Sequence, residues 1–276
     1  MTALPMGLDM AAMDNPLNAA VVMRDRKVID MVEQAIARRH MFLAYQPVFN
    51  AANHDQAVFY EGLMRLRDGS GRVIPAAQFI AITETSEIGR KIDCLALEEG
   101  LRALAQNEGL QLSVNMSARS IGYSPWTDTL EAGLALSPTI AERLILEVTE
   151  ASAMIMPDIV SAFMSRLQSV GIRFALDDFG AGYTSFRYLR DLLFDMVKID
   201  GQFIRDISES PDNQVLTSAL VEISRHFDML TIAEGVEQAE DAAFVRSMGV
   251  DCVQGYLFGA PTENQPWNRQ NSMATA

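Results

Sequence analysis

Polar side chains that could bind cations or transfer protons recur along the chain, each at or near the end of a short apolar run. They lie 20 to 54 residues apart, mostly the length of one strand plus one helix. In chain order they are Glu61, Asn115, Glu147, Asp177 with Asp178, Lys198, Glu234 and Gln254. Five are carboxylates, which repel one another strongly when gathered without compensation. If the fold brings these residues together, bound cations are the natural way to relieve that repulsion.

Each position also has an ordinary structural explanation. A single Glu, Asn or Lys after a strand commonly caps a helix or lies in a solvated loop. A buried network of structural charges could account for several of them at once. Recurrence at seven of eight expected strand ends favours one shared site.

The adjacent carboxylates Asp177 and Asp178 are the most specific local feature. Neighbouring carboxylates just after a strand can face two cations, with one Asp bridging them. Two divalent cations about 4 Å apart suit phosphodiester hydrolysis. Residues 179–185 follow with two glycines, Gly180 and Gly182, which indicates a mobile loop over the site. A plain left-handed turn is the alternative.

The elements that must position these residues are short, apolar, β-branched runs alternating with helical patterns. The expected strands are 42–48, 58–65, 110–115, 144–149, 172–177, 196–200, 230–234 and 251–255. Helical spacing is clearest over 24–40, 157–170 and 214–227. This alternation predicts a (β/α)8 barrel, whose strands converge on one mouth where active sites lie. A doubly wound open sheet is the competing arrangement.

Length and composition indicate one globular domain of 276 residues, 49% of them hydrophobic. We expect a flexible leader over 1–23, the barrel over 24–262 and a mobile tail over 263–276. No run approaches the roughly 18 apolar residues of a membrane span, and the N-terminus lacks the basic region of a signal peptide. Two cysteines without a partner motif, Cys94 and Cys252, favour a reduced cytoplasmic protein.

The formal charge of −14 argues against binding to polymeric nucleic acid, although a small phosphodiester remains compatible if cations neutralise the site. The three scattered histidines, His40, His54 and His226, argue against a histidine-rich zinc centre. Oxygen ligands instead favour Mg²⁺, Mn²⁺ or Ca²⁺.

Eight short motifs in a fixed order make the sequence resemble the EAL family of cyclic di-GMP phosphodiesterases from about residue 42 to 261. The motifs are Tyr45-Gln46-Pro47-Val48, Glu61-Gly62-Leu63-Met64-Arg65, Ser113-Val114-Asn115-Met116-Ser117, Leu146-Glu147-Val148-Thr149-Glu150, Asp177-Asp178-Phe179-Gly180-Ala181-Gly182-Tyr183, Val197-Lys198-Ile199-Asp200, Ala233-Glu234-Gly235-Val236-Glu237 and Gln254-Gly255-Tyr256. The resemblance implies a modified TIM barrel with its first strand antiparallel to the rest. It also implies metal-dependent hydrolysis of cyclic di-GMP to linear pGpG.

The resemblance further implies two metal ions, Mg²⁺ or Mn²⁺, with Ca²⁺ inhibitory. The first ion would be bound by Glu61, Asn115, Glu147 and Asp177. Asp177 would bridge to a second ion, held also by Asp178 and Glu234.

Roles for the remaining motif residues also follow from the resemblance. Lys198 would contact the attacking water and Glu234 is a candidate base, so the catalytic set is Lys198, Glu234, Glu61 and Asp177. The residues expected to contact the substrate are Gln46, Leu63, Arg65 and Gln254. Glu150 would stabilise the loop after Asp178.

The sequence departs from the family pattern at positions that carry no expected metal ligand. Gly62 stands where the signature has Ala, and Leu66 where Trp is usual, which would remove aromatic surface beside the substrate strand. Residues 79–89 follow the family only loosely. These departures bear on substrate affinity and turnover more than on chemistry.

Two other functions remain open. A catalytically silent cyclic di-GMP receptor acting through a protein partner is the main alternative; such members generally lose metal ligands, and here every matching position is filled. An enolase-type lyase with a lysine base is the second, but it would need a capping domain for which about 40 residues before the first strand are too few. Family members also often dimerise near residues 183–193, so a homodimer is expected. Regulation by a protein partner, by expression or by the chain's own assembly is left open.

Overall fold

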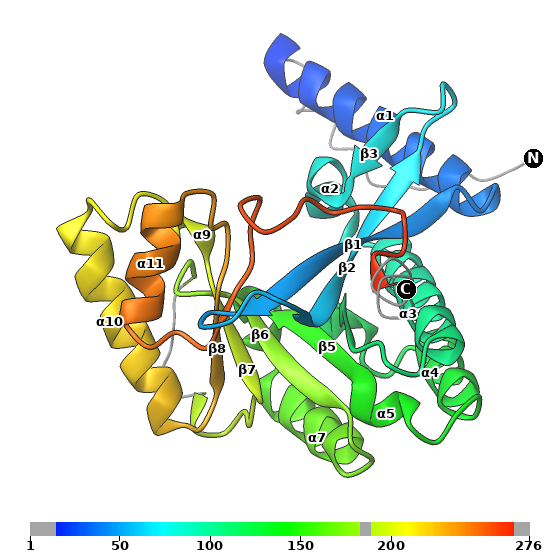
Figure 1. Cartoon of the computed structure of the whole chain (residues 1–276). Coiled ribbons are helices and arrows are strands. Elements are labelled where there is room, and N and C mark those ends of the chain that lie inside the picture. The colour runs from blue at the N-terminus through cyan, green and yellow to red at the C-terminus, as the bar shows by residue number, and fades with distance from the viewer. Residues whose placement is uncertain (1–14, 183–188, 268–276) are drawn as a thin grey trace, which may run out of the picture.

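The computed structural model describes residues 15–182 and 189–267 (Figure 1). Its strands are short and mostly buried, as expected of strands covered on both faces. They are β1 (Met41–Asn50), β2 (Ala57–Arg67), β3 (Val73–Pro75), β4 (Leu112–Asn115), β5 (Leu144–Thr149), β6 (Arg173–Phe179), β7 (Met196–Ile199), β8 (Leu230–Ala233) and β9 (Cys252–Val253). All eight expected strands are present, and β3 is an additional one.

The strands form a closed ring with one reversed member. The sheet order is β1-β9-β8-β7-β6-β5-β4-β2-β3, and a further pairing between β1 and β2 closes it. β1 runs antiparallel to both of its neighbours, β2 and β9, whereas all other neighbours in the ring are parallel. β3 only extends β2 outside the ring. The predicted modified barrel with an antiparallel first strand is confirmed.

Helices surround this ring, as Figure 1 shows for α3, α4, α7, α10 and α11. The helices are α1 (Pro16–Ala37), α2 (Ile80–Thr83), α3 (Glu87–Gln106), α4 (Ser124–Leu134), α5 (Ile140–Arg143), α6 (Glu150–Ala153), α7 (Pro157–Gln168), α9 (Gly201–Ile204), α10 (Pro211–His226) and α11 (Ala239–Ser247), with 3-10 turns η2 (Ala76–Gln78) and η3 (Ala118–Ser120). Among the described helices, none combines the length and hydropathy needed to cross a bilayer.

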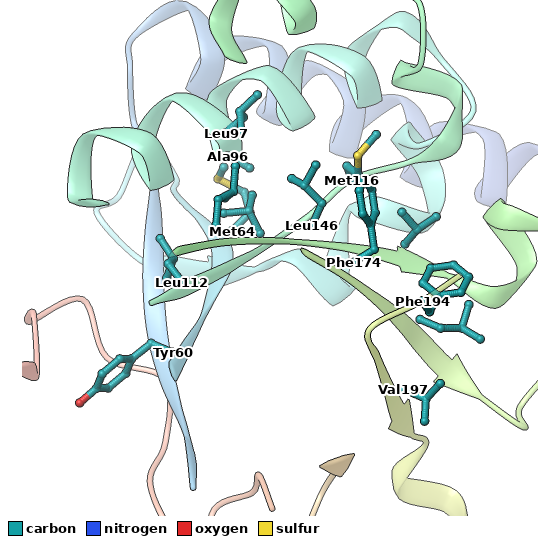
Figure 2. Packing of buried hydrophobic residues seen from close by; sticks show 14 of the residues in the cluster. Tyr60, Met64, Ala96, Leu97, Leu112, Met116, Leu146, Phe174, Phe194 and Val197 are labelled. Carbon is teal, nitrogen blue, oxygen red and sulfur yellow. The ribbon is translucent and has the colours of Figure 1, made fainter. Parts of the chain in front are cut away.

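Two separate apolar clusters reflect the two faces of the ring. The larger lies between strands and helices; in Figure 2, Ala96 of α3 lies beside Met64 of β2. The smaller takes one residue from each of seven ring strands: Val48, Phe59, Ile145, Ala175, Met196, Ile232 and Cys252. Since successive strand residues alternate between faces, this second cluster fills the interior of the barrel.

The chain ends differ from the predicted leader and tail. Helix α1 begins at Pro16, so residues 16–23 are helical; Asn15 caps the helix by accepting a hydrogen bond from the backbone of Leu17 at 2.9 Å. Residues 1–14 lie outside the described part of the chain. At the other end, Trp267 is buried and packs edge-on against Tyr45 and Tyr60. The tail expected from residue 263 is therefore anchored through 267, and residues 268–276 are not described.

The apolar spacing over 157–170 predicts a helix that buries Ile159, Phe163, Leu167 and Val170 and stops at Gly171. This prediction was partly wrong. In α7, Phe163 and Leu167 are buried as expected, but Ile159 is exposed and Val160 and Met164 are buried instead. Val170 lies beyond the end of the helix and is also exposed. Both faces fit a helical period, and the packing against the barrel selects between them. The helix ends at Gln168, two residues before the predicted end, and Gly171 follows with a positive φ of 101°.

Candidate active site

A polar layer lies directly above the apolar interior of the barrel. On six strands a site residue stands two positions after an interior apolar residue, as Glu61 follows Phe59 and Lys198 follows Met196. On the reversed strand β1, Gln46 comes two positions before Val48. A two-residue step returns to the same face of a strand. The polar residues thus form the next interior layer toward the mouth, where the sequence predicted them.

The ammonium group of Lys198 lies at the centre of this layer. Its Nζ is 2.7 Å from Glu234 Oε1, 2.9 Å from Glu147 Oε2, and 3.2 Å from both Glu61 Oε2 and Asp177 Oδ1. Lys198 is 1% exposed. One positive charge therefore faces four carboxylates from four different strands or strand ends, and the cluster keeps an excess of negative charge.

The pKa values of these groups record that excess. Burial, followed by repulsion from Asp177 and Glu61, raises the pKa of Glu234 to about 8. Burial and the neighbouring Glu61 raise the pKa of Glu147 well above its ordinary value. Burial would lower the pKa of Lys198, but the surrounding carboxylates raise it. The raised pKa values show that these carboxylates bind protons readily. Bound divalent cations, each with a higher charge than the ammonium group, would neutralise the same carboxylates in place of protons.

Glu61 is the best stabilised carboxylate of the layer. Burial would raise its pKa, yet Lys198 and hydrogen bonds from two amides lower it. Gln254 donates to Glu61 Oε2 at 2.7 Å, and Asn115 donates to Oε1 at 2.9 Å. Gln254 also donates to Gln46 Oε1 at 3.2 Å. Asn115 and Gln254 thus contact the carboxylate that the signature motif supplies, and Gln46 is linked to it through Gln254.

A β-bulge explains how two adjacent carboxylates can face one site. The pairing of β6 with β7 shifts register between Leu176 and Phe179, and Asp178 has a left-handed φ of 57°. In a regular strand, Asp177 and Asp178 would point to opposite faces; the bulge re-aims the second. Burial, then the charges of Asp177 and Asp200, raises the pKa of Asp178 to about 6.

The donor set fits divalent cations with a preference for oxygen ligands. Carboxylate oxygens of Asp177, Asp178 and Glu234 all lie within 4.8 Å of one another. These three residues are the set predicted for the second ion. Of the set predicted for the first ion, Glu61, Glu147 and Asp177 surround Lys198, and Asn115 is bonded to Glu61. Hard oxygen donors of this kind suit Mg²⁺ or Mn²⁺.

A cavity of about 390 Å³ opens above this layer, within the range of small-molecule sites. Three of the four expected substrate contacts, Gln46, Leu63 and Gln254, line it. Arg65 stands two positions beyond Leu63, outside the lining, and partial burial lowers the pKa of its guanidinium.

Four further lining residues, Gly235, Glu237, Gly255 and Tyr256, were given no role by the sequence reasoning. Two of the quoted motifs contain them. The signal that could have found them is their place one to three residues beyond the site residues Glu234 and Gln254.

Glu150 holds the segment after the bulge. It is 2% exposed, and its Oε2 accepts a hydrogen bond from the backbone N–H of Gly180 at 3.2 Å. Gly180 has a φ of 94°, and a β-carbon there would lie 2.9 Å from the Phe203 ring. Of the predicted mobile loop, residues 183–185 fall outside the described part of the chain.

Two departures from the family signature have little effect on the cavity. Leu66 is fully buried in the outer core, on the strand face opposite Glu61, Leu63 and Arg65. The aromatic surface expected to be missing at Leu66 would therefore lie in the outer core beside this strand, away from the cavity. At Gly62, a β-carbon would lie 3.0 Å from Leu43 Cδ1 and 3.2 Å from the Ser113 carbonyl oxygen, so glycine here permits close strand packing.

The fold and this layer define a barrel with a carboxylate-rich mouth, and comparison with known proteins supplies the family. The sequence profile of the EAL domain matches residues 29–261, so the chain belongs to the EAL family. It is 32% identical over 239 residues to the cyclic di-GMP phosphodiesterase PdeF of Escherichia coli strain K12, over 85% of this chain and 32% of that protein. It is 29% identical over 234 residues to the cyclic di-GMP phosphodiesterase PdeB of Shewanella oneidensis, over 83% of this chain and 27% of that protein. The chain thus spans about a third or less of the length of these relatives.

Solved structures agree with this assignment. A MucR phosphodiesterase in complex with c-di-GMP superposes with a TM-score of 0.76 at 29% identity, over 87% of this chain and 99% of that one. The FimX EAL domain from Pseudomonas aeruginosa bound to c-di-GMP gives a TM-score of 0.75 at 27% identity, over 85% and 96%. The same fold therefore accommodates c-di-GMP in both relatives.

Proposed function

We propose that this chain is a phosphodiesterase that hydrolyses cyclic di-GMP to linear pGpG with the help of two divalent cations. The observation that carries the proposal is the mouth layer, in which Lys198 is surrounded by carboxylates and every expected ligand position is filled. Cyclic di-GMP phosphodiesterases among the relatives support the choice of substrate.

The cations would be held by the predicted ligands, Mg²⁺ or Mn²⁺ being favoured and the larger Ca²⁺ inhibitory. The first ion would use Glu61, Asn115, Glu147 and Asp177. The second would use Asp177, Asp178 and Glu234. Bound there, divalent cations supply Lewis-acid activation of the phosphodiester and of water.

The chain's own residues would then handle the proton and the substrate. In the reaction, the oxygen of water bonds to phosphorus, the bond between phosphorus and the ribose 3′ oxygen breaks, and that oxygen gains a proton. Lys198 would orient the water through its ammonium hydrogens, and Glu234, 2.7 Å from that ammonium, would accept the proton. Gln46, Leu63 and Gln254 would contact the substrate, and Arg65 suits a phosphate.

A catalytically silent receptor for cyclic di-GMP is the competing function, because the FimX domain shows a relative with c-di-GMP bound. The filled ligand positions favour the enzyme. The two functions differ in one measurable product. The chain is incubated with cyclic di-GMP and Mg²⁺, Mn²⁺, Ca²⁺ or a chelator, and pGpG is followed by chromatography.

We expect pGpG with Mg²⁺ or Mn²⁺ and none with Ca²⁺ or the chelator. Glu61→Ala, prepared in parallel, controls for a contaminating phosphodiesterase, whose activity would persist in it. Tight binding of cyclic di-GMP without product in any metal would overturn the enzyme and favour the receptor.

The setting of the activity follows the same expectations. We propose a cytoplasmic chain that acts on cyclic di-GMP, not on polymeric nucleic acid or a membrane, as a homodimer and under a regulatory protein partner. Within the expected dimer region, residues 183–188 are not described. Leu189 and Leu192 are buried in the core, and Leu193 is 67% exposed. Leu193 is therefore the described apolar residue of that region most suited to an interface.

A further inference from the structure

The turn that follows Asn115 is held from one side by a buried carboxylate. Asp93 of α3 is 7% exposed, and its Oδ2 accepts hydrogen bonds from the backbone N–H of Ser117 at 3.0 Å and the hydroxyl of Ser120 at 2.6 Å. Asp93 does not line the mouth cavity. Its hydrogen bonds connect it to the turn after Asn115, and Asn115 belongs to the polar layer.

Helix α6 holds the same turn from the other side. Ser152 Oγ accepts a hydrogen bond from the backbone N–H of Ala118 at 2.8 Å and lies 3.5 Å from Ser117 Oγ. The helix begins at Glu150, whose carboxylate accepts from Gly180. A four-residue helix thus connects the turn after Asn115 with the segment after the Asp177–Asp178 bulge.

These contacts matter because the strand itself ends at the ligand. Asn115 is the last residue of the four-residue strand β4, paired with Glu147 of β5. Beyond it, the backbone N–H of Met116 still donates to the Glu147 carbonyl at 2.9 Å. The turn has backbone hydrogen bonds of its own, such as that from Ser120 N–H to the Ser117 carbonyl at 2.9 Å, but side chains of α3 and α6 tie it to the neighbouring helices. Side chains behind a metal ligand commonly fix its orientation, and their loss weakens metal binding.

We propose that Asp93 and Ser152 are positioning residues that keep Asn115 in the orientation required for cation binding. The proposal rests on the proposed function, since it assigns Asn115 to the first cation. It makes α3 and α6, which lie outside the mouth, part of what determines metal affinity.

The geometry of Asp93 offers a discriminating pair of substitutions. Both donors reach the same oxygen, Oδ2. Asp93→Asn keeps an amide oxygen that can accept both hydrogen bonds, whereas Asp93→Ala leaves two buried donors without that acceptor. Ser152→Ala removes the other anchor with a smaller change in volume.

Asp241 provides a matched control. It is also a buried carboxylate, 3% exposed, and accepts hydrogen bonds from the backbone N–H groups of Asp206 at 3.1 Å and Ser208 at 3.0 Å. The loop it holds carries none of the predicted ligands. Asp241→Ala should therefore reduce thermal stability as Asp93→Ala does, without changing the affinity for metal.

The test measures Mn²⁺ binding directly, from the electron paramagnetic resonance signal of free Mn²⁺, on the full chain and its variants. Hydrolysis as a function of Mg²⁺ concentration is the second readout. We expect the dissociation constant for Mn²⁺ to rise about tenfold or more in Asp93→Ala and about threefold or more in Ser152→Ala, whereas Asp93→Asn stays within about threefold of wild type. Asp241→Ala should leave it unchanged.

Equal Mn²⁺ affinity in Asp93→Ala, Ser152→Ala and wild type would overturn the proposal, as would an equal loss in Asp241→Ala. If Asp93→Ala does not fold, Ser152→Ala decides: unchanged affinity overturns the proposal and weakened affinity supports it. A wild-type chain that binds no Mn²⁺ would instead refute the proposed metal-dependent function, together with the inference that rests on it.

Discussion

Replacing Lys198 with methionine tests the electrostatic core of the site, because methionine keeps the volume and removes the charge. The ammonium group contacts four buried or half-buried carboxylates at 2.7 to 3.2 Å. Breaking a buried ion pair on one side costs about 3–5 kcal/mol. For a domain of this size, we expect Lys198→Met to lower the melting temperature in a chelator by roughly 6–20 °C.

The exposed pair between Lys91 and Glu87 is the matched control. Its N–O distance of 3.2 Å equals that between Lys198 and Glu61, but both of its side chains are exposed. Lys91→Met should therefore change stability by less than about 1 kcal/mol. The assay is thermal unfolding of both variants and wild type, followed by circular dichroism in the chelator.

Mg²⁺ gives the experiment its second arm. If cations and Lys198 neutralise the same carboxylates, added Mg²⁺ should raise the melting temperature of Lys198→Met more than that of wild type, because ligands stabilise the state that binds them. A Lys198→Met chain that melts within about 2 °C of wild type in the chelator would refute the reasoning. The ammonium charge would then contribute little to the stability of the folded chain.

Three further predictions concern single side chains. Glu61→Ala should lower the rate of pGpG formation about 100-fold or more, because an anionic ligand without a substitute is lost; a rate within threefold of wild type in the same chromatographic assay would contradict the assignment. Asp178→Asn should lower the rate about 100-fold at limiting Mg²⁺, and an unchanged rate would exclude two cooperating cations. Burial raises the pKa of Asp93 to about 7, so between about pH 4 and pH 7 the folded chain binds a proton that the unfolded chain has released. The free energy of unfolding from urea titration should therefore fall with rising pH in that window relative to Asp93→Asn; parallel pH profiles of the two chains would contradict it.

Much of the barrel and its polar layer could be predicted because the strands have a simple period. The limits of β5 agree with the sequence at both ends, and the reversed first strand follows from the family resemblance. Once the strands converge on one mouth, the topology determines that a residue at a strand end, such as Glu147, lies at that mouth. Its meeting with Lys198 follows from topology more than from any local property.

Other features depend on contacts distant in sequence and could not be predicted locally. The bulge that turns Asp178 toward Asp177 is a property of the β6–β7 pairing. Trp267 packs against Tyr45, which is more than two hundred residues away in the sequence. The polar composition of the C-terminal segment therefore could not predict this contact. The buried face of α7 was chosen by its barrel neighbours between two stripes of similar apolarity.

The most direct test of the account is to locate the cations. Crystals of the chain grown with Mn²⁺ would be measured near the manganese absorption edge, so that anomalous scattering marks each ion. We predict two peaks about 4 Å apart at the mouth, with Asp177 between them and Asn115 and Asp178 on opposite sides. A mouth without a peak, or a single ion remote from Asp177, would contradict the claim that these side chains bind a pair of cations.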